Sequence, residues 1–495
     1  MRKTILIGGK AGQGPNILAI LLSESLVKKG LNVFCSREYE SLIRGGHNYN
    51  LLTISDEQVL SNDSKIDILV ALDENTVSLH KKELAKKSIT IADKKETENM
   101  YFAGRLFKCL GLPLEILQDE LKKLKNFDNN LKNATRGYKV EKSRSSLPET
   151  RPKQASFTNG NQGIADGAIK SGIDIYYAYP MTPATAVMSE LAAKEKEKNI
   201  LVMELENEIA VIVAAVGSAI TGAKSMIGTS GGGFDLMTEA LSLAGQAEVP
   251  VVCYLSQRPG PSTGLATETG QGDVQMARYA GHGEFFRLVV APGDPLEAQE
   301  LTSQSFYFTQ KYKIPAIILS DKHLSESLYT SSQEPIITPS KKSTELIRYN
   351  SYEHNDSGEA TESIEQIKKN IESRLKKIEQ ITKESENFPM YKIYGNKNSK
   401  NIILSHGSTK GSILDAIRGL DMKFIQVLYI EPFPKKITDE LRNAKKIILV
   451  ENNATGMLAD ILAEKTGIMI EQKNKILRYD GRPFTVDELE EKIKS

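Results

Sequence analysis

Short apolar runs, each followed by a helical pattern, recur along the 495-residue chain. Residues 4–7 (Thr-Ile-Leu-Ile) and 68–72 (Ile-Leu-Val-Ala-Leu) have the length of buried strands, and an apolar helix is expected over 16–29. Runs that are apolar throughout are typical of parallel strands covered on both faces, since neither side of such a sheet meets water. The pattern therefore predicts an α/β protein with three doubly wound parallel-sheet domains.

Two polar segments divide the chain. Residues 125–158 are rich in Lys, Asn, Ser and Pro and lack periodicity, which predicts a linker. Residues 329–400 are charged and contain a helical run at 364–382, which we interpret as a linker with a surface helix. Three α/β domains are accordingly expected over 1–124, 159–328 and 401–495, each large enough for its own core.

Composition narrows the classes of function. The formal net charge is +1, which gives no electrostatic reason to expect a nucleic-acid partner. The apolar runs are far shorter than the roughly 20 residues that span a bilayer, and the N-terminus reads as a strand rather than a secretory signal. We therefore expect a cytoplasmic protein that does not bind membranes.

Metal chemistry is not expected in the chain itself. The three cysteines, Cys35, Cys109 and Cys253, lie far apart and form no Cys-x-x-Cys motif. A disulfide framework, a zinc site and an iron–sulfur cluster are therefore all disfavoured. No His/Asp/Glu cluster in the sequence has the spacing of metal ligands either.

The first chemical signal is the segment 179–185, Tyr-Pro-Met-Thr-Pro-Ala-Thr, which follows a predicted strand over 173–177. Its Pro-x-Thr-Pro turn puts Thr182 where a strand gives way to a helix, and open parallel sheets bind ligands at such carboxyl ends. Glu208 follows a second apolar run and precedes a long Ala/Val/Gly helix. A hydroxyl and a carboxylate facing one crevice indicate a cofactor that needs acid–base activation.

Two glycine-rich turns follow predicted strands. The first, residues 8–14, departs from both common nucleotide fingerprints. Ile17 replaces the third glycine of Gly-x-Gly-x-x-Gly, and Pro15 and Asn16 stand where a P-loop has Lys-Ser/Thr. A phosphate site of another type and a structural turn both stay open. The second turn, residues 229–233, follows a strand, which favours contact with a ligand over tight packing alone.

A third loop, residues 257–267, follows another buried strand and carries Arg258 in a Gly/Pro-rich stretch. A guanidinium can bind a small carboxylate through two parallel hydrogen bonds, although a lone arginine is more often part of a surface ion pair. The hydroxyls of Ser262, Thr263 and Thr267 in the same loop favour the substrate-binding interpretation.

Taken in order, these motifs resemble the α subunit of 2-oxoacid:ferredoxin oxidoreductases, in the form with a fused γ domain. The matching segments are residues 8–14, 43–46, 160–168, 179–185, 206–210, 229–233, 258–267, 451–456 and 479–484. The resemblance implies a γ-like domain over 1–124, a thiamine diphosphate pyrimidine-binding domain over 159–328 and a transketolase C-terminal-like domain over 401–495. It also implies oxidative decarboxylation of a 2-oxoacid to an acyl-CoA and CO₂, with thiamine diphosphate as cofactor, coenzyme A as co-substrate and ferredoxin as electron acceptor.

The resemblance further implies roles for individual residues. Glu208 would hydrogen-bond the aminopyrimidine of the cofactor, with Glu204 and Glu206 as alternatives that align less well. Thr182 would lie near the reacting centre, and Arg258 would hold the substrate carboxylate. The implied catalytic residues are Glu208, Thr182 and Arg258, and the implied cofactor-binding residues are Tyr179, Pro180, Glu208, Ser230, Gly231 and Gly232. The implied substrate-binding residues are Arg258, Ser262, Thr263 and Thr267, and the candidates for coenzyme A are Gly12, Gly14, Arg44 and Gly46.

Two features of the family are missing from the sequence: the Gly-Asp-Gly segment with downstream Asn-Asn that holds Mg²⁺, and the cysteines of a cluster. A β subunit is therefore expected to bring Mg²⁺, a [4Fe-4S] cluster and the diphosphate half of a shared site, in an αβ or (αβ)₂ assembly. The fused γ domain and the Gly-Pro-Ser-Thr-Gly motif favour 2-oxoglutarate over pyruvate or branched 2-oxoacids. The alternatives are a transketolase-like transferase or decarboxylase subunit, and a non-enzymatic assembly or regulatory paralogue.

Overall fold

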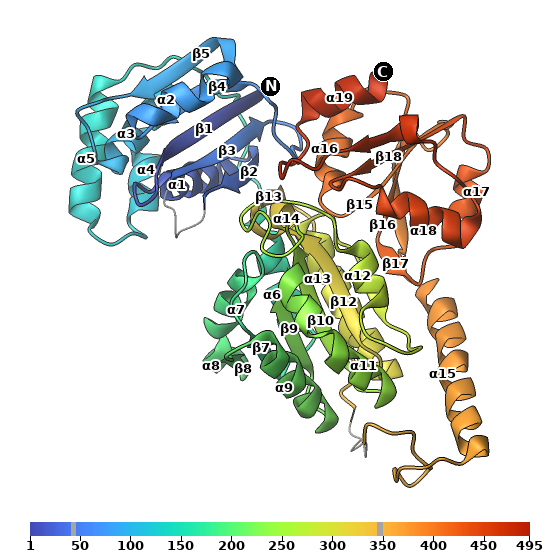
Figure 1. Cartoon of the computed structure of the whole chain (residues 1–495). Coiled ribbons are helices and arrows are strands. Elements are labelled where there is room, and N and C mark those ends of the chain that lie inside the picture. Colours follow the sequence, from blue (N-terminus) through green and yellow to red (C-terminus); the bar gives the residue numbers. More distant parts are fainter. Residues whose placement is uncertain (41–45, 344–349) are drawn as a thin grey trace.

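Three sheets organise the chain in the computed structural model, which describes residues 1–40, 46–343 and 350–495 (Figure 1). Helices pack on all three sheets, so the predicted α/β class is confirmed. An N-terminal, a central and a C-terminal unit are each built on one sheet, and Figure 1 shows the central unit below the other two.

The sheet of the N-terminal unit is mixed. This unit consists of β1 (Arg2–Lys10), α1 (Pro15–Lys28), β2 (Asn32–Glu38), β3 (His47–Ser55), β4 (Ile66–Ala71), α2 (Glu74–His80), β5 (Leu84–Ala92), α3 (Asn99–Cys109), α4 (Leu114–Leu121) and α5 (Phe127–Val140). β1, β4 and β5 are parallel, whereas β3 runs antiparallel to β1 and β2. The expected purely parallel sheet is corrected here, because only residues 39–46 separate β2 from β3 and a parallel crossover needs about a dozen residues.

Helix α5 lies inside the segment 125–158 that the sequence predicts as a linker. It packs on α3 through a close backbone contact. A Cβ atom on Gly137 would lie 1.9 Å from the carbonyl oxygen of Tyr101, and one on Gly104 would lie 1.9 Å from that of Ala134. Glycine allows this approach, so tertiary contact stabilises a helix whose polar composition concealed it.

Two short strands from the ends of the predicted linkers extend the same sheet. β13 (Leu328–Ser331) pairs antiparallel with β2, and β6 (Ser156–Thr158) pairs with β13. The hydroxyl of Thr330 accepts a hydrogen bond from the backbone N–H of Val33 at 2.9 Å. The N-terminal unit is therefore joined to the central unit by paired strands.

The central sheet is parallel except at one edge. Its strands are β7 (Ile175–Ala178), β8 (Leu201–Glu204), β9 (Ser225–Thr229), β10 (Val251–Gln257), β11 (Leu288–Val290) and β12 (Ala316–Asp321), and its helices are α6 (Gly160–Lys170), α7 (Thr185–Ala192), α8 (Glu195–Lys198), α9 (Glu208–Ile220), α10 (Gly231–Leu236), α11 (Thr238–Gln246), α12 (Val274–Tyr279), α13 (Pro295–Tyr312) and α14 (Lys322–Glu326). The strand order is β17-β11-β12-β10-β9-β7-β8, with only β17 (Tyr429–Glu431) antiparallel to its neighbour. The carboxyl ends of β7 to β10 consequently lie along one edge.

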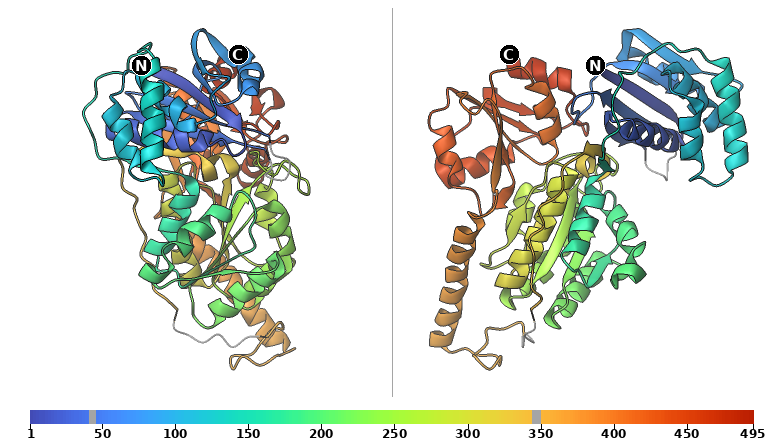
Figure 2. Two further views of the ribbon diagram at one scale, coloured as in Figure 1. Left: turned by 90° about the vertical axis from the view of Figure 1, so that its left-hand side faces the viewer. Right: turned by 180° about the vertical axis from the view of Figure 1, so that it is seen from behind.

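The C-terminal unit begins with a long exposed helix. The helical run predicted over 364–382 is α15 (Ile364–Ser385), which extends alongside the central unit in both views of Figure 2. Strand β14 (Tyr391–Gly395) then starts inside the range 329–400 predicted as a linker, because it pairs antiparallel with β16 and completes that sheet. The remaining elements are β15 (Asn401–His406), α16 (Thr409–Ala416), β16 (Lys423–Val427), α17 (Ile437–Leu441), β18 (Lys446–Glu451), α18 (Met457–Thr466), β19 (Lys475–Leu477) and α19 (Val486–Lys494).

The central and C-terminal units share one apolar core. Leu255 of the central sheet and Leu404 of the C-terminal sheet belong to the same cluster of buried side chains. At this junction Glu297 Oε1 lies 2.7 Å from Lys410 Nζ and 3.0 Å from Lys392 Nζ. Burial alone would raise the pKa of Glu297, but these cations hold it below its usual value. The contacts fix the C-terminal unit against the central sheet.

Candidate active site

Loops from four strand ends converge at the carboxyl edge of the central sheet. β8, β7, β9 and β10 are consecutive neighbours in this sheet. The loops after them carry, respectively, Glu208, Thr182, the turn 230–233 and Arg258. The sheet order thus brings together segments that are distant in sequence, at the edge where parallel sheets bind ligands.

Glu208 opens helix α9, whose N-cap Asn207 accepts a hydrogen bond from the backbone N–H of Ala210 at 2.9 Å. The Glu208 residue is only 4% exposed. Within the part of the chain that the structure describes, its buried Oε1 atom has no hydrogen-bond partner. Because an unsatisfied buried carboxylate oxygen is costly, a donor from outside this chain is expected to meet it.

The glycine turn after β9 gives Glu208 its place. A Cβ atom on Gly233 would lie 2.6 Å from Glu208 Oε1 and 2.3 Å from Thr229 Oγ1. A Cβ atom on Gly232 would meet no described atom within 4 Å, so this backbone borders open space. Ser230 is fully buried, and its hydroxyl also finds no partner among the described residues. The turn therefore has one side against Glu208 and one side open.

Thr182 and Arg258 meet directly. Arg258 Nη1 donates a hydrogen bond to the backbone oxygen of Thr182 at 3.0 Å. The hydroxyl of Thr229 points at the sulfur of Met181 at 4.0 Å, which joins the same loop to the glycine turn. Burial lowers the pKa of Arg258 from its very high usual value, and the Asp273 carboxylate acts in the opposite direction. These contacts connect the Thr182 loop to both the glycine turn and Arg258.

Asp273 is a residue of this edge that the sequence reasoning missed. Its Oδ2 atom is buried and has no hydrogen-bond partner within the described ranges. A Cβ atom on Gly231 would lie 2.7 Å from this oxygen, so the carboxylate packs on the glycine turn. Burial, and then the neighbouring Asp235, raise the pKa of Asp273 to about 6, against the opposing effect of Arg258. An Asp after the Gly-Gln-Gly stretch of the same loop was the available signal.

The other candidates of this edge lie further out. Ser262 and Thr263 are exposed on the outer turn of the loop, where Ser262 has a φ of +57°, and Thr267 is half-buried. Tyr179 is 40% exposed and Pro180 is exposed beside it. These side chains border solvent rather than the buried end of the crevice.

The arginine loop is anchored to both other units. Arg482 of the C-terminal unit pairs with Glu268 of the loop. It also lies 3.5 Å from Glu38 of β2, and Glu38 in turn pairs with Lys322 of α14 at 3.0 Å. The loop thus lies where the three units meet.

The glycines proposed for coenzyme A lie together in the N-terminal unit. Gly12, Gly14 and Gly46 have φ values of +91°, +80° and +147°, which favour glycine. The backbone N–H of Ala11 donates to the oxygen of Gly46 at 3.0 Å and joins the two turns. Arg44 lies outside the described residues.

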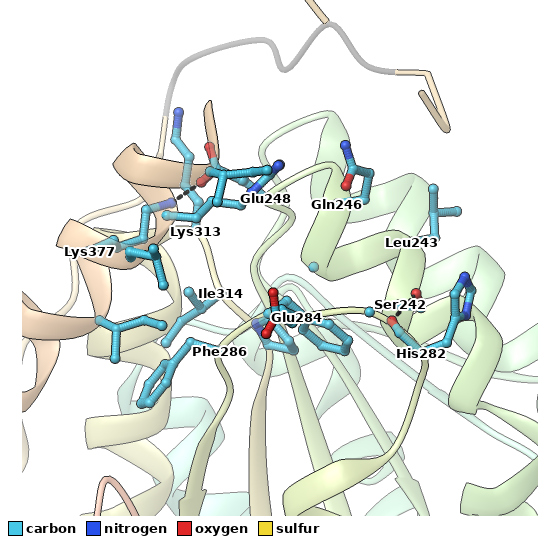
Figure 3. Close-up of a pocket in the computed structure, with 18 of the residues that line it drawn as sticks. Ser242, Leu243, Gln246, Glu248, His282, Glu284, Phe286, Lys313, Ile314 and Lys377 are labelled. Atoms are coloured by element: carbon cyan, nitrogen blue, oxygen red, sulfur yellow. Dashed lines mark hydrogen bonds and ion pairs between the residues drawn. The ribbon is translucent and has the colours of Figure 1, made fainter. Parts of the chain in front are cut away.

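A separate groove of about 610 Å³ opens between the central unit and α15 (Figure 3). Its labelled lining residues include Leu243, Phe286, Ile314 and the ion pair of Glu248 with Lys377. Glu248 and Ile314 precede β10 and β12, so the groove lies at the amino edge of the sheet, opposite the converging loops. It is therefore not part of the candidate active site.

In the described ranges no helix is long and apolar enough to cross a membrane. The same residues hold no group of three or more His, Cys, Asp or Glu side chains that could bind a metal ion.

Two protein-family models match the sequence. The model described as "Pyruvate flavodoxin/ferredoxin oxidoreductase, thiamine diP-bdg" matches residues 166–391, and the model "Pyruvate ferredoxin/flavodoxin oxidoreductase" matches residues 4–98. The first match covers the converging loops and identifies a thiamine diphosphate-binding domain there.

Known relatives match the whole chain or the larger part of it. The 2-oxoacid:ferredoxin oxidoreductase subunit alpha of a Sulfolobus species is 30% identical, and the alignment covers 100% of this chain and 96% of the relative. The 2-oxoglutarate synthase subunit KorA of Methanocaldococcus jannaschii is also 30% identical, over 61% of this chain and 89% of its own length.

A solved structure has the same fold. It is the 2-oxoglutarate:ferredoxin oxidoreductase from Magnetococcus marinus with 2-oxoglutarate, coenzyme A and succinyl-CoA bound. The match has a TM-score of 0.88, covers 99% of both chains and reaches 23% sequence identity. The arrangement of the three units is therefore shared with that protein.

Proposed function

The chain belongs to the family of 2-oxoacid:ferredoxin oxidoreductase α subunits, and from this premise we propose that its central unit supplies half of an active site for oxidative decarboxylation of 2-oxoglutarate. One observation carries the proposal: the buried carboxylate of Glu208 leaves Oε1 without a partner among the described residues, against a glycine turn with an open side. We expect a buried, unpartnered carboxylate oxygen beside open space in a site that a bound cofactor completes.

The residues present fit thiamine diphosphate. Glu208 Oε1 would accept a hydrogen bond from the aminopyrimidine, and the Ser230 hydroxyl could contribute a second polar contact. Gly231 and Gly232 would let a flat ring approach the backbone, with Tyr179 and Pro180 at the rim. When bound, the cofactor supplies a carbon nucleophile for the 2-oxo group and an electron sink for loss of CO₂. Glu208 would hold the proton that activates it.

Arg258 is proposed to bind the substrate carboxylate. Its guanidinium is partly buried and already fixed by one hydrogen bond to the Thr182 oxygen, which leaves other N–H groups for a two-point contact. Thr182 would lie beside the reacting carbon. Ser262, Thr263 and Thr267 would add hydroxyl contacts on the solvent side of the loop.

The preference for 2-oxoglutarate rests on two relatives. One is named a 2-oxoglutarate synthase subunit, and the other is a 2-oxoglutarate:ferredoxin oxidoreductase. Pyruvate and branched 2-oxoacids are the competing substrates. Gly12, Gly14, Arg44 and Gly46 of the N-terminal unit are proposed to contact coenzyme A, which would accept the acyl group.

A β subunit is proposed to cover an exposed apolar surface beside Glu208. We give the name α9 surface to exposed apolar side chains of α9 and of the nearby elements α10 and β8. They are Ile209, Val213, Leu236, Leu201 and Met203, which are 53%, 50%, 53%, 48% and 37% exposed. Such a patch next to an incomplete site is typical of a protein–protein interface. The β subunit would bring Mg²⁺, a [4Fe-4S] cluster and the route to ferredoxin, in an αβ or (αβ)₂ complex.

Turnover by the assembled complex tests the proposal. The chain is purified anaerobically with its β partner, and viologen reduction is measured with 2-oxoglutarate, pyruvate and branched 2-oxoacids, with and without coenzyme A. We expect reduction that requires both coenzyme A and a 2-oxoacid, fastest with 2-oxoglutarate. Glu208→Gln should lower turnover by roughly 10²-fold or more, whereas Glu204→Gln, an exposed neighbour, should not.

The alternative function, a transketolase-like transferase, predicts a different result. A complex that contains β subunit, iron and thiamine diphosphate, yet reduces no viologen with any 2-oxoacid, would contradict the proposal and favour a transketolase-like transferase or a regulatory role. A full loss of turnover in Glu204→Gln but not in Glu208→Gln would move the cofactor role to the other carboxylate.

A further inference from the structure

Asp273 lies in the candidate active site without a contact that explains its burial. It precedes α12, yet its side chain makes no capping hydrogen bond to that helix. Its backbone N–H donates to Gln257 Oε1 at 2.9 Å, and Gln257 Nε2 donates to the Ser320 oxygen at 2.9 Å. This chain of bonds holds the Asp273 backbone against the ends of β10 and β12. The side chain is thereby directed at the glycine turn, with Oδ2 buried and unpartnered among the described residues.

The packing on Gly231 shows how closely the carboxylate is held. A Cβ atom on Gly231 would lie 2.7 Å from Asp273 Oδ2 and 3.3 Å from Oδ1. Any larger residue at position 231 would push the carboxylate away. Asp273 and Glu208 therefore lie against the same turn, Glu208 at Gly233 and Asp273 at Gly231, each with one buried oxygen that no described residue meets.

Charges around Asp273 come from two elements. Asp235 of α10 faces it with a like charge, and Arg258 of the loop after β10 faces it with the opposite charge. The Asp273 carboxylate acts electrostatically on Arg258 and opposes the effect of burial on the pKa of that guanidinium. Arg258 donates a hydrogen bond to the backbone oxygen of Thr182. Before a ligand binds, the positive charge of Arg258 therefore acts on the Asp273 carboxylate.

We propose that Asp273 is a positioning residue that couples substrate binding to proton uptake: when an anionic 2-oxoacid binds Arg258, Asp273 becomes protonated, which removes the repulsion between its carboxylate and the incoming one. The inference rests on the proposed function, because it assumes that Arg258 binds the substrate.

The charge balance follows directly. A carboxylate on Arg258 brings a second negative charge toward Asp273, and a like charge favours the neutral form of an acid. Burial and Asp235 already raise the pKa of Asp273 to about 6. The Asp273 carboxylate takes one proton from water, no bond of the substrate breaks, and this proton offsets the charge of the one substrate carboxylate that lies at Arg258.

The pH dependence has a defined sign. Below pH 6 Asp273 is already neutral, and binding consumes no proton. Above pH 6 each binding event takes up as much as one proton, so affinity falls by up to tenfold for each pH unit. In Asp273→Asn the group cannot titrate, and affinity should stay level over the same range and exceed that of the wild type at pH 8.

Calorimetry on the αβ complex without thiamine diphosphate tests the coupling, because no turnover occurs in that state. The probe is the 2-oxoacid that supports turnover of the loaded enzyme, titrated at pH 7 in two buffers of different ionisation enthalpy. We expect the heat to depend on the buffer in the wild type, corresponding to proton uptake, and to be equal in both buffers for Asp273→Asn. Asp119→Asn removes an exposed acid of α4 and should behave as the wild type.

A second variant covers the case in which Asp273→Asn fails to fold or assemble. Asp235→Asn removes the like charge beside Asp273 and should shift the pH dependence of binding to lower pH. In the loaded enzyme the same shift should occur in KM and not in kcat. Buffer-independent heat in the wild type, or an unchanged pH profile in Asp235→Asn, overturns the inference while leaving the proposed function intact. Absence of turnover with every 2-oxoacid overturns both.

Discussion

The carboxyl edges of the central and C-terminal sheets contrast in what fills them. The central edge keeps Glu208 and Asp273 with buried oxygens that lack partners among the described residues. At the C-terminal edge, Glu451 accepts hydrogen bonds from the Leu458 N–H at 3.1 Å and from Asn453 Nδ2 at 3.1 Å. Asn452 and Gln271 close this edge with backbone and side-chain bonds. The carboxyl ends of the parallel strands thus form an open site in the central sheet and a hydrogen-bonded junction, here called the sealed edge, in the C-terminal sheet.

The difference lies in the residues that follow each strand. The central edge has glycines at 231–233, which let Asp273 and Glu208 pack against the backbone and leave open space at Gly232. At the C-terminal edge, Glu451 and the asparagines after β18 are hydrogen-bonded, the central unit inserts Gln271, and the two ring nitrogens of buried His406 lack hydrogen-bond partners among the described residues. In this protein a strand end is therefore open to a ligand where glycines leave space beside buried polar groups. Substitutions that fill one edge or unseal the other test this conclusion.

The largest effect is expected from filling the open edge with Gly233→Ala. The new methyl group would lie 2.6 Å from Glu208 Oε1 and 2.3 Å from Thr229 Oγ1, so the carboxylate must move. Displacement of a catalytic group by about 1 Å can cost on the order of 10²-fold in rate, and we expect such a loss in 2-oxoacid-dependent viologen reduction. Gly272→Ala is the matched control, because its Cβ would meet no described atom within 4 Å. Equal losses in both variants would contradict the steric explanation.

The next effect concerns the α9 surface. Val213→Lys places a charge on a half-exposed apolar position of α9 and should weaken assembly with the β subunit by at least tenfold, since burying an unpaired charge is costly. Leu375→Lys on α15 is the control, because Leu375 is 55% exposed but lies on a different helix. Analytical ultracentrifugation of the αβ mixture measures the result. Normal assembly of Val213→Lys would place the β subunit elsewhere.

A substitution at the sealed edge should change the free energy of unfolding rather than turnover. Burial raises the pKa of Glu451 to about 8, with its hydrogen bonds opposing, and burial lowers the pKa of the adjacent His406 to about 4. Glu451 is therefore neutral when folded at pH 7 but ionised when unfolded. Because the unfolded state releases this proton from about pH 4.5 upward, Glu451 lowers the free energy of unfolding by up to about 1.4 kcal/mol for each pH unit until pH 8.

Glu451→Gln should remove that slope. Glutamine keeps an oxygen for the Leu458 N–H and cannot ionise, so the variant should be more stable than the wild type at pH 8 and similar at pH 4.5. Thermal unfolding across this pH range measures the difference. A variant that is less stable at pH 8 would show that the ionised carboxylate stabilises the junction.

The sequence could place those residues of the open edge that directly follow a strand, but not those brought there by a loop that folds back. The sequence places Thr182, Glu208 and Arg258 at one edge because each follows an apolar run, and parallel strands bring their carboxyl ends to one edge. Their roles there stay predictions. Asp273 lies 15 residues beyond Arg258, and only the return of the chain toward Gly231 shows its place. Hydrophobic periodicity shows on which face of its helix or strand a residue lies. It does not show which distant loop packs against that residue.

The same limit explains the errors in organisation. Helix α5 packs an apolar stripe on the N-terminal core, formed by Phe127, Leu131, Ala134 and Tyr138, and its glycine contacts α3. The polar residues between these positions made the composition of the segment resemble that of a linker. The antiparallel β3 and the added strands β6 and β13 depend on pairing between distant segments. By contrast, the exposed helical run of α15 is a local property, and the sequence predicted it directly.

The smallest effect is expected where the two edges are linked. Arg482 accepts a hydrogen bond at its backbone oxygen from Asn452 of the sealed edge, at 2.8 Å, while its side chain pairs with Glu268 of the open loop. The Arg482 side chain is 45% exposed, and pairs of this kind contribute about 0–1 kcal/mol. Arg482→Gln should therefore leave the melting temperature nearly unchanged. Because Glu268 anchors the loop that carries Arg258, KM for the 2-oxoacid should rise by about two- to fivefold at constant kcat. A matching fall in kcat would mean instead that the sealed edge controls the geometry at Glu208 as well.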